Sequence, residues 1–385
     1  MKKKILKTVF SIIIIIICGA ISIYIITDRA IKTEDNNPDI FLSDSWLEIP
    51  VKINDKSTFA IFDTGAQICV LNESSSDKFD VIRFPLKFIK VNNHKWHEIG
   101  IIPSLKINNF EYKNVMTLLV DFKTEDTWLK CSQSELILGM NIIKKSIWKF
   151  DFETSIFSNI EKNEVDSINY TNFIQYSGYL TPMTQIVVNQ KSFPVLIDFG
   201  YTGSINLLFE SRERDNQTNY TQSDKANLHG NYSDAGEIVI SDVILNKDTL
   251  LNQVVDYSNS GESLIGMRLF KRYSTVAIDP FQKKIKLLGK TKTRYTDYFF
   301  NHGFRFDKNM NVSFINNASP AYEQGLRADD IIIKINNYLT DSIKGLDYCM
   351  FIDWREGIFQ SETIELIVMR DNQQFEFTIK KGRYK

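Results

Sequence analysis

Three things are scarce in this sequence: cysteine, histidine and net charge. The 385 residues include 46 basic and 47 acidic side chains, so no basic field indicates a nucleic acid partner. Four scattered cysteines do not indicate a disulfide framework, and a Cys69–Cys131 bridge stays open. Of the four histidines, His94 and His97 are close together, but the glutamate follows the second one, which favours solvated residues at a hairpin tip over a metal site. We expect neither a metal nor a cofactor.

Long apolar runs are also scarce, apart from one at the N-terminus. Residues 8–27 carry no charge and are about as long as the ~20 residues that span a bilayer. The lysines before this run predict a cytoplasmic N-terminus and an extracytoplasmic bulk, in a periplasm or at a cell surface. A cleaved signal peptide is the alternative, but its apolar core is usually only about 7–15 residues. We expect residues 1–27 to be a membrane anchor and residues 28–44 a polar stalk.

An internal repeat follows. "NDKSTFAIFDTG" at 54–65 aligns without a gap with "NQKSFPVLIDFG" at 189–200. A second landmark recurs in the same order, because "LILGM" at 136–140 resembles "SLIGM" at 263–267. In both copies an alternating apolar segment precedes the first landmark, which predicts a hairpin whose second strand ends at an aspartate. Two landmarks in one order indicate a duplication.

The repeat divides the chain into three folded parts. We expect β-rich lobes at 45–165 and 166–292, each with one short helix. From residue 293 to residue 385 the pattern changes to strand, short helix, strand and a final hairpin, which predicts a separate α+β domain. The expected fold class is therefore mainly β.

The repeated aspartates, Asp63 and Asp198, carry the functional question. An apolar strand delivers Asp63 to a tight turn, where Gly65 permits close backbone approach and the Thr64 hydroxyl can brace the turn. Aspartate before glycine is also common turn chemistry, because its side chain bonds nearby backbone amides. The residues alone leave two readings, a catalytic pair or two turn-capping carboxylates.

At this point the chain resembles the retropepsin-like aspartic proteases. Asp63-Thr64-Gly65-Ala66 is similar to the catalytic turn of that family, and Ile137-Leu138-Gly139 to its second signature. The resemblance implies two retropepsin-like lobes fused in one chain, a peptide substrate, and a pair of carboxylates that share one proton while activating water. It also implies the site residues: Asp63 and Asp198 as the dyad, supported by Thr64, Gly65, Ala66 and Gly200.

The second copy departs from the family pattern. Phe199 stands where the family carries threonine or serine, and Tyr201 where alanine or serine is expected. In the family that hydroxyl hydrogen-bonds across the lobe interface, and phenylalanine cannot make this bond. A non-catalytic, protease-like peptide-binding or scaffold protein is therefore the alternative to an endopeptidase.

The C-terminal residues resemble a PDZ domain of the type attached to bacterial proteases. The resemblance rests on "GFRF" at 303–306 and "ASPAYEQGLRADDIIIKINN" at 318–337. It implies that a peptide end adds as a strand and that a loop receives its carboxylate. The loop residues would be Gly303, Phe304, Arg305 and Phe306. The alternative is a domain that only packs on the lobes.

A trypsin-like serine protease is a rival reading that the sequence does not support. "SNSGES" at 258–263 resembles its nucleophile turn, but Gly266 comes too late for that motif. None of the four histidines stands in a recognisable catalytic-base motif.

Overall fold

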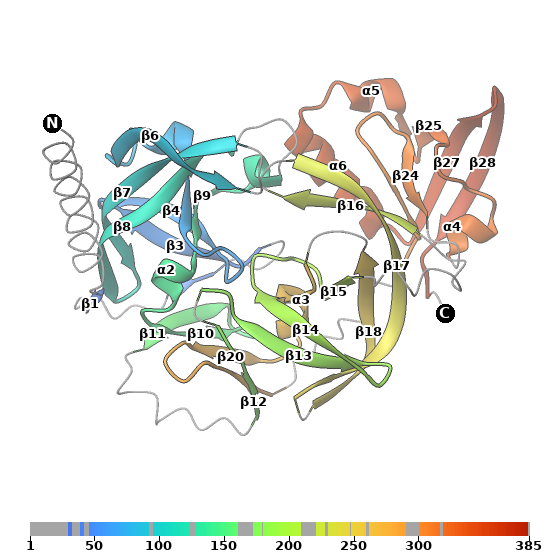
Figure 1. Cartoon of the computed structure of the whole chain (residues 1–385). Helices are drawn as coiled ribbons and strands as arrows, with labels where there is room; N and C mark the ends of the chain where they lie inside the picture. Colours follow the sequence, from blue (N-terminus) through green and yellow to red (C-terminus); the bar gives the residue numbers. More distant parts are fainter. Residues whose placement is uncertain are drawn as a thin grey trace, which may run out of the picture.

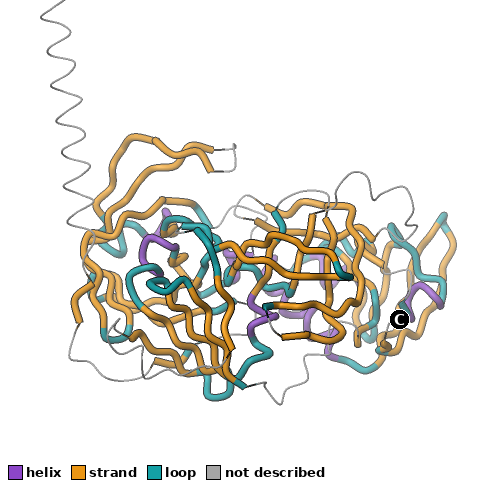
Figure 2. The backbone as a smooth tube through the Cα atoms, turned by 60° about the horizontal axis from the view of Figure 1, so that its bottom comes forward, coloured by secondary structure: helices purple, strands orange, loops and turns teal. Residues whose placement is uncertain are grey.

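The computed structural model confirms a mainly β protein with short helices (Figures 1 and 2). It describes residues 30–32, 39–41, 46–91, 95–122, 128–160, 172–178, 180–208, 221–227, 230–246, 248–258, 262–289, 300–315 and 319–383. No helix within these ranges is long and apolar enough to cross a bilayer. The predicted anchor at 8–27 lies outside them.

The first lobe is built on an eight-stranded sheet of order β1-β8-β5-β9-β4-β3-β7-β6. Its hairpins and buried alternation follow from the apolar pattern, since one face of each strand must be covered. The strands are β1 (Ala30–Lys32), β3 (Glu48–Ile53), β4 (Lys56–Phe62), β5 (Cys69–Asn72), β6 (Ile82–Val91), β7 (Lys95–Ile107), β8 (Phe110–Val120) and β9 (Ser134–Leu138). Three short helices accompany them: η1 (Glu73–Ser75), η2 (Trp128–Cys131) and α2 (Met140–Ile143).

The second lobe repeats this plan with a seven-stranded sheet of order β13-β14-β19-β15-β18-β17-β16. In both lobes the aspartate strand pairs in parallel with the strand that leads into a Gly-Met step. The first hairpins also turn alike, through two consecutive residues with positive φ, Asn54-Asp55 and Asn189-Gln190. The elements are β13 (Met183–Val188), β14 (Lys191–Asp198), β15 (Ile205–Leu208), β16 (Thr221–Asn227), β17 (Gly230–Leu245), β18 (Asp248–Ser258), β19 (Leu264–Gly266) and α3 (Met267–Phe270).

A six-stranded sheet contributed by both lobes joins them along the lower side of Figure 1. Its order is β12-β21-β20-β10-β11-β2, and the lobes meet where β10 pairs antiparallel with β20. One continuous apolar core runs through both lobes. The strands are β2 (Asp39–Ile40), β10 (Ile147–Asp151), β11 (Ile156–Ile160), β12 (Asn172–Gln175), β20 (Thr275–Asp279) and β21 (Lys284–Leu288).

Two pieces of the predicted stalk are attached to the first lobe. Strand β1 pairs with β8, strand β2 pairs with β11, and Phe41 is buried in the core. The edges of β8 and β11 offer backbone groups that need partners, and these short segments supply them. Residues 30–32 and 39–41 therefore belong to the lobe and not to a free stalk.

The C-terminal unit has its own apolar core. It contains a two-stranded β22–β29 ladder, a β23–β24 hairpin and a sheet of order β26-β25-β27-β28. An ion pair between the buried Asp330 and the half-buried Arg370 braces it. Its elements are β22 (Phe300–Asn301), β23 (Phe304–Phe306), β24 (Val312–Ile315), α4 (Pro320–Glu323), β25 (Ile331–Ile335), β26 (Tyr338–Leu339), α5 (Thr340–Lys344), α6 (Tyr348–Gln360), β27 (Thr363–Arg370), β28 (Gln373–Lys380) and β29 (Gly382–Arg383).

A disulfide ties this unit to the first lobe. Cys131 at the end of η2 bonds to Cys349 at the start of α6, with Cα atoms 5.2 Å apart. The open Cys69–Cys131 pairing is therefore wrong: Cys69 is a free thiol inside the first lobe, and burial raises its pKa to about 12. The C-terminal unit also contacts the second lobe, where β16 lies against β24.

Candidate active site

Asp63 sits where β4 ends, at the junction of the two lobes. Its Oδ1 accepts hydrogen bonds from the backbone amides of Gly65, at 2.7 Å, and Ala66, at 3.0 Å. The apolar residues before it fix the strand, and the two amides fix the carboxyl group at the strand end. The side chain is half-buried.

Asp198 repeats this arrangement at the end of β14. Its Oδ1 accepts from the amides of Gly200, at 2.8 Å, and Tyr201, at 3.0 Å. Tyr201 thus fills the place of Ala66 with its backbone, so its unexpected side chain does not disturb the turn. The two copies of the motif predicted by the repeat form the same turn.

The two turns face each other. The carboxyl groups of Asp63 and Asp198 are hydrogen-bonded to one another. A Cβ atom on Gly65 would lie 2.8 Å from a carboxylate oxygen of Asp198, and one on Gly200 would lie 2.7 Å from both oxygens of Asp63. Only glycine fits at these two positions, because each backbone packs directly against the aspartate of the other lobe.

Burial raises the pKa of both carboxyl groups, whereas the hydrogen bond between them lowers the pKa of Asp63 and raises that of Asp198. Burial raises the pKa of Asp63 above its usual range, although the amides of Ala66 and Gly65 oppose this. Burial, followed by the charge of Asp63 and the hydrogen bond to it, raises the pKa of Asp198 well above its usual range. The larger rise at Asp198 favours this carboxyl group as the one of the pair that keeps a proton.

A single hydroxyl links the lobes beside this pair. Thr64 is buried; its Oγ1 donates to the carbonyl of Ile197, at 2.7 Å, and accepts from the amide of Phe199, at 3.0 Å. The reciprocal hydroxyl is missing because residue 199 is phenylalanine. Half of the expected cross-lobe hydrogen bonding is therefore present, and it comes from the first lobe.

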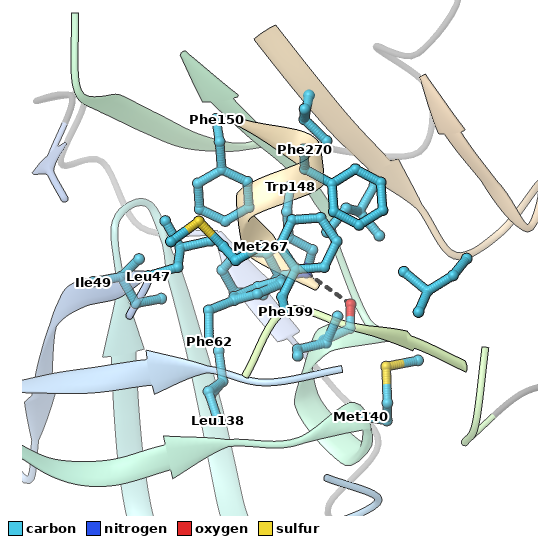
Figure 3. Close-up of a cluster of buried hydrophobic side chains, with 14 of the residues drawn as sticks. Leu47, Ile49, Phe62, Leu138, Met140, Trp148, Phe150, Phe199, Met267 and Phe270 are labelled. Atoms are coloured by element: carbon cyan, nitrogen blue, oxygen red, sulfur yellow. Dashed lines mark hydrogen bonds between the residues drawn. The ribbon is translucent and has the colours of Figure 1, made fainter. Parts of the chain in front are cut away.

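Phe199 contributes to the junction by packing instead. Its side chain is fully buried and stacks on Phe270 of α3, with ring centroids 4.5 Å apart and an interplanar angle of 13°. It also meets Phe62 of the first lobe edge to face at 6.0 Å, as Figure 3 shows. The residue that breaks the motif thus joins the aromatic core that the two lobes share.

The comparison with protein families agrees with this geometry over the first lobe. Residues 49–142 match the family model described as aspartyl protease. The match supports an aspartic protease family and suggests a peptidase. It includes Asp63 and ends before the second copy, so Asp198 lies outside it. No curated protein matches the chain.

Two further aspartates use the same turn, and within the described part of the chain neither is hydrogen-bonded to another carboxyl group. Asp151 ends β10 and accepts from the amides of Glu153 and Thr154, and Asp279 ends β20 and accepts from Phe281 and Gln282. Capping such a turn is therefore not what distinguishes Asp63 and Asp198. What distinguishes Asp63 and Asp198 is that their carboxyl groups approach each other across the junction of the two lobes. No single stretch of sequence shows this approach.

The other described residues singled out by sequence lie on other elements. His97 is buried on β7, so it is not a solvated tip residue, and His94 is outside the described residues. In the C-terminal unit β23 turns Phe304 and Phe306 inward and leaves Arg305 exposed. Gly303 precedes the strand with φ 81°, a conformation that favours glycine.

Helix α6 packs beside β23. Arg355 Nη1 donates to the carbonyl of Phe306, at 3.3 Å, and the rings of Phe351, Trp354 and Phe359 contact Phe306. The Phe306 carbonyl therefore already has a hydrogen-bond donor from α6.

Proposed function

We propose that this protein is an aspartic endopeptidase in which Asp63 and Asp198 form the catalytic dyad. The observation that carries the proposal is the direct approach of two carboxyl groups, each fixed by two amides of its own turn and each packed against the glycine of the other lobe. Two carboxylates this close cannot both ionise readily, so one proton is shared.

In the proposed mechanism Asp63 is the base and Asp198 the acid. The oxygen of a water molecule attacks the peptide carbonyl carbon while Asp63 takes a proton from that water. At the same time Asp198 donates its proton to the carbonyl oxygen. The resulting tetrahedral intermediate loses the amine when the nitrogen receives a proton from Asp63 and one hydroxyl of the intermediate returns a proton to Asp198, which restores the dyad. The C–N bond breaks, one acid and one amine form, and no covalent enzyme intermediate is involved.

The test compares Asp63→Asn, Asp198→Asn and Asp151→Asn in the full chain. Asparagine keeps the Oδ1 that accepts the two turn amides but removes the ionisable group. Cleavage of an unfolded protein, followed from pH 3 to pH 7, should be lost in the first two variants and kept in the third. Asp151 is the matched control, since it caps the same kind of turn outside the pair.

Two outcomes would contradict the proposal. Cleavage that survives both dyad substitutions would refute these residues as the catalytic pair. A wild-type protein that binds peptides and cleaves none would favour the alternative, a non-catalytic peptide-binding or scaffold protein.

We also propose that the C-terminal unit is a PDZ domain that binds peptide ends along β23, through the backbone of residues 303–306. Binding there must displace the Arg355 donor from the Phe306 carbonyl. Replacing Arg355 by Ala should therefore tighten binding of a carboxyl-terminal peptide, measured by fluorescence anisotropy. Amidation of the peptide end is the control, and equal binding of the two peptides would count against carboxylate recognition.

Finally, we propose that residues 8–27 anchor the chain in a membrane with the lobes on the extracytoplasmic side. The Cys131–Cys349 disulfide supports this location, because disulfides persist in oxidising compartments. Membranes from cells that express the full chain should retain it after a high-salt wash, whereas a chain without residues 1–27 should be released. Release of both would contradict the anchor.

A further inference from the structure

The first lobe begins almost directly after the proposed membrane anchor. The apolar run ends at Thr27, and strand β1 of the first lobe begins three residues later, at Ala30. Three residues span at most about 10 Å, because an extended chain advances about 3.3–3.6 Å per residue. A free stalk over residues 28–44 would instead reach about 60 Å. Ala30 is therefore held close to the end of the apolar run.

Two attachments keep this part of the chain on the lobe. Strand β1 is the edge strand of the first-lobe sheet and pairs along its whole length with β8 (Figure 1). Strand β2 pairs with β11, and the ring of Phe41 beside it is buried edge to face against Phe150. The tether between an anchor at 8–27 and the lobe is therefore only the short segment before Ala30.

The sheet register locates Asp63 relative to this tether. Strand β4, which ends before Asp63, is four strands away from β1, or about 19 Å at about 4.8 Å per strand. The strand pairings put Asp63 level with Met116 of β8, about 14 Å along that strand from Tyr112, the partner of Ala30. Ala30 and Asp63 are thus about 24 Å apart on a flat sheet, and curvature of the sheet shortens this distance.

From this geometry we infer that the protein cleaves chains that are themselves attached to the membrane, at bonds close to the bilayer. The short tether and the distance across the sheet together keep Asp63 within about 35 Å of the end of the apolar run. An extended substrate chain covers this height in about 10 residues. The inference rests on the proposed dyad and the proposed anchor, and it adds the class of substrate: the segments of membrane proteins that adjoin the bilayer.

A short tether favours such substrates for two physical reasons. A bond that stands farther from the bilayer is out of reach, because the paired strands β1 and β2 do not lengthen the tether. A substrate anchored in the same bilayer shares a thin layer with the enzyme, which raises its effective concentration without any new contact. A peptide in solution has no such advantage.

The experiment uses vesicles that contain the full chain and a single-pass substrate with one unfolded, cleavable segment. This segment stands either 5 residues from the bilayer or on an alanine-rich helical spacer of 40 residues, about 60 Å long. The wild type should cleave the near segment at least about tenfold faster than the far one. A variant with 30 glycine and serine residues inserted between Asp28 and Arg29 should cleave the two within about threefold of each other. In detergent, which removes the common bilayer, the wild type should cleave both equally.

The results separate this inference from the proposed function. Equal cleavage of the near and far segments by the wild type in vesicles, or an insertion without effect, would overturn the inference. Cleavage in detergent that is lost in Asp63→Asn would still support the peptidase.

A second measurement reports the position of the lobe without using activity. Met116 is exposed and level with Asp63, so a dye on Met116→Cys, in a chain that also carries Cys18→Ser, reports the height of the dyad. Energy transfer from this dye to acceptor lipids should fall at least about twofold when the 30-residue insertion is present, because that linker adds about 30 Å of end-to-end distance. Equal transfer in the two chains would refute the short tether.

Discussion

Replacing Phe199 by threonine restores the family motif, and the structure predicts that this restoration destabilises the protein. The phenylalanine is fully buried between the lobes and stacks on Phe270. Truncating a buried phenylalanine costs about 3–5 kcal/mol. A threonine hydroxyl at position 199 that made the same kind of cross-lobe hydrogen bond as Thr64 would add only about 0.5–1.5 kcal/mol of stability. The free energy of unfolding should therefore fall by roughly 2–4 kcal/mol, a large part of the about 5–15 kcal/mol of a typical domain.

The assay is urea unfolding followed by tryptophan fluorescence, combined with peptide cleavage well below the transition. Phe199→Thr should unfold at a lower urea concentration but keep kcat/KM within about threefold of the wild type, because the Thr64 bonds still align the turns. Phe199→Leu is the control: it keeps more apolar volume, adds no hydroxyl, and should lose less stability. A Phe199→Thr protein as stable as the wild type would refute the packing role assigned here.

Four further predictions follow from the site and its surroundings. Thr64→Val leaves a buried carbonyl and a buried amide without hydrogen-bond partners, and each loss should reduce the free energy of unfolding by roughly 1–3 kcal/mol. The variant should therefore have a lower unfolding midpoint and slower peptide cleavage. Because the folded-state pKa of Asp198 is raised, wild-type stability falls as pH rises above about 4; Asp198→Asn should therefore melt at a higher temperature than the wild type at pH 7, with the difference shrinking toward pH 4. Burial lowers the pKa of His302 to about 4, so the C-terminal unit should lose up to about 3 kcal/mol as pH falls from about 6.5 to 4, and calorimetry of His302→Phe should show a weaker acid dependence. After proteolytic cleavage between lobes and C-terminal unit, wild-type fragments should stay linked on a non-reducing gel, whereas Cys349→Ser fragments should separate.

The sequence was sufficient to predict the parts of the site that depend on local pattern. Alternation and turn residues indicate hairpins, and the repeat matches Asp63 with Asp198. It could not predict the location of Phe199, because whether residue 199 packs inward or reaches across the junction depends on the position of α3. The Cys131–Cys349 bond likewise joins segments 218 residues apart, whose proximity no local pattern encodes.

The strand register of the second lobe illustrates a further limit. A strand shows only that alternate residues share a face, and a shift of one residue reverses which face they share. The segment from Asp198 to Asn206 is one residue longer than the segment from Asp63 to Val70, so a gapless alignment matches Asn206 with Leu71, a core residue. Only the observed pairing with Leu264 shows that Asn206 lies on the aspartate side.

The six-stranded sheet has a consequence for how the molecule assembles. One edge of β10 pairs with β20 of the other lobe. Both strands belong to the same chain, and this connection holds their edges at a high effective concentration for pairing. A first lobe produced alone would expose the edge of β10, and such edges readily pair with other chains. Separated lobes are therefore expected to self-associate through this edge. Their covalent fusion keeps these two edges paired within one chain.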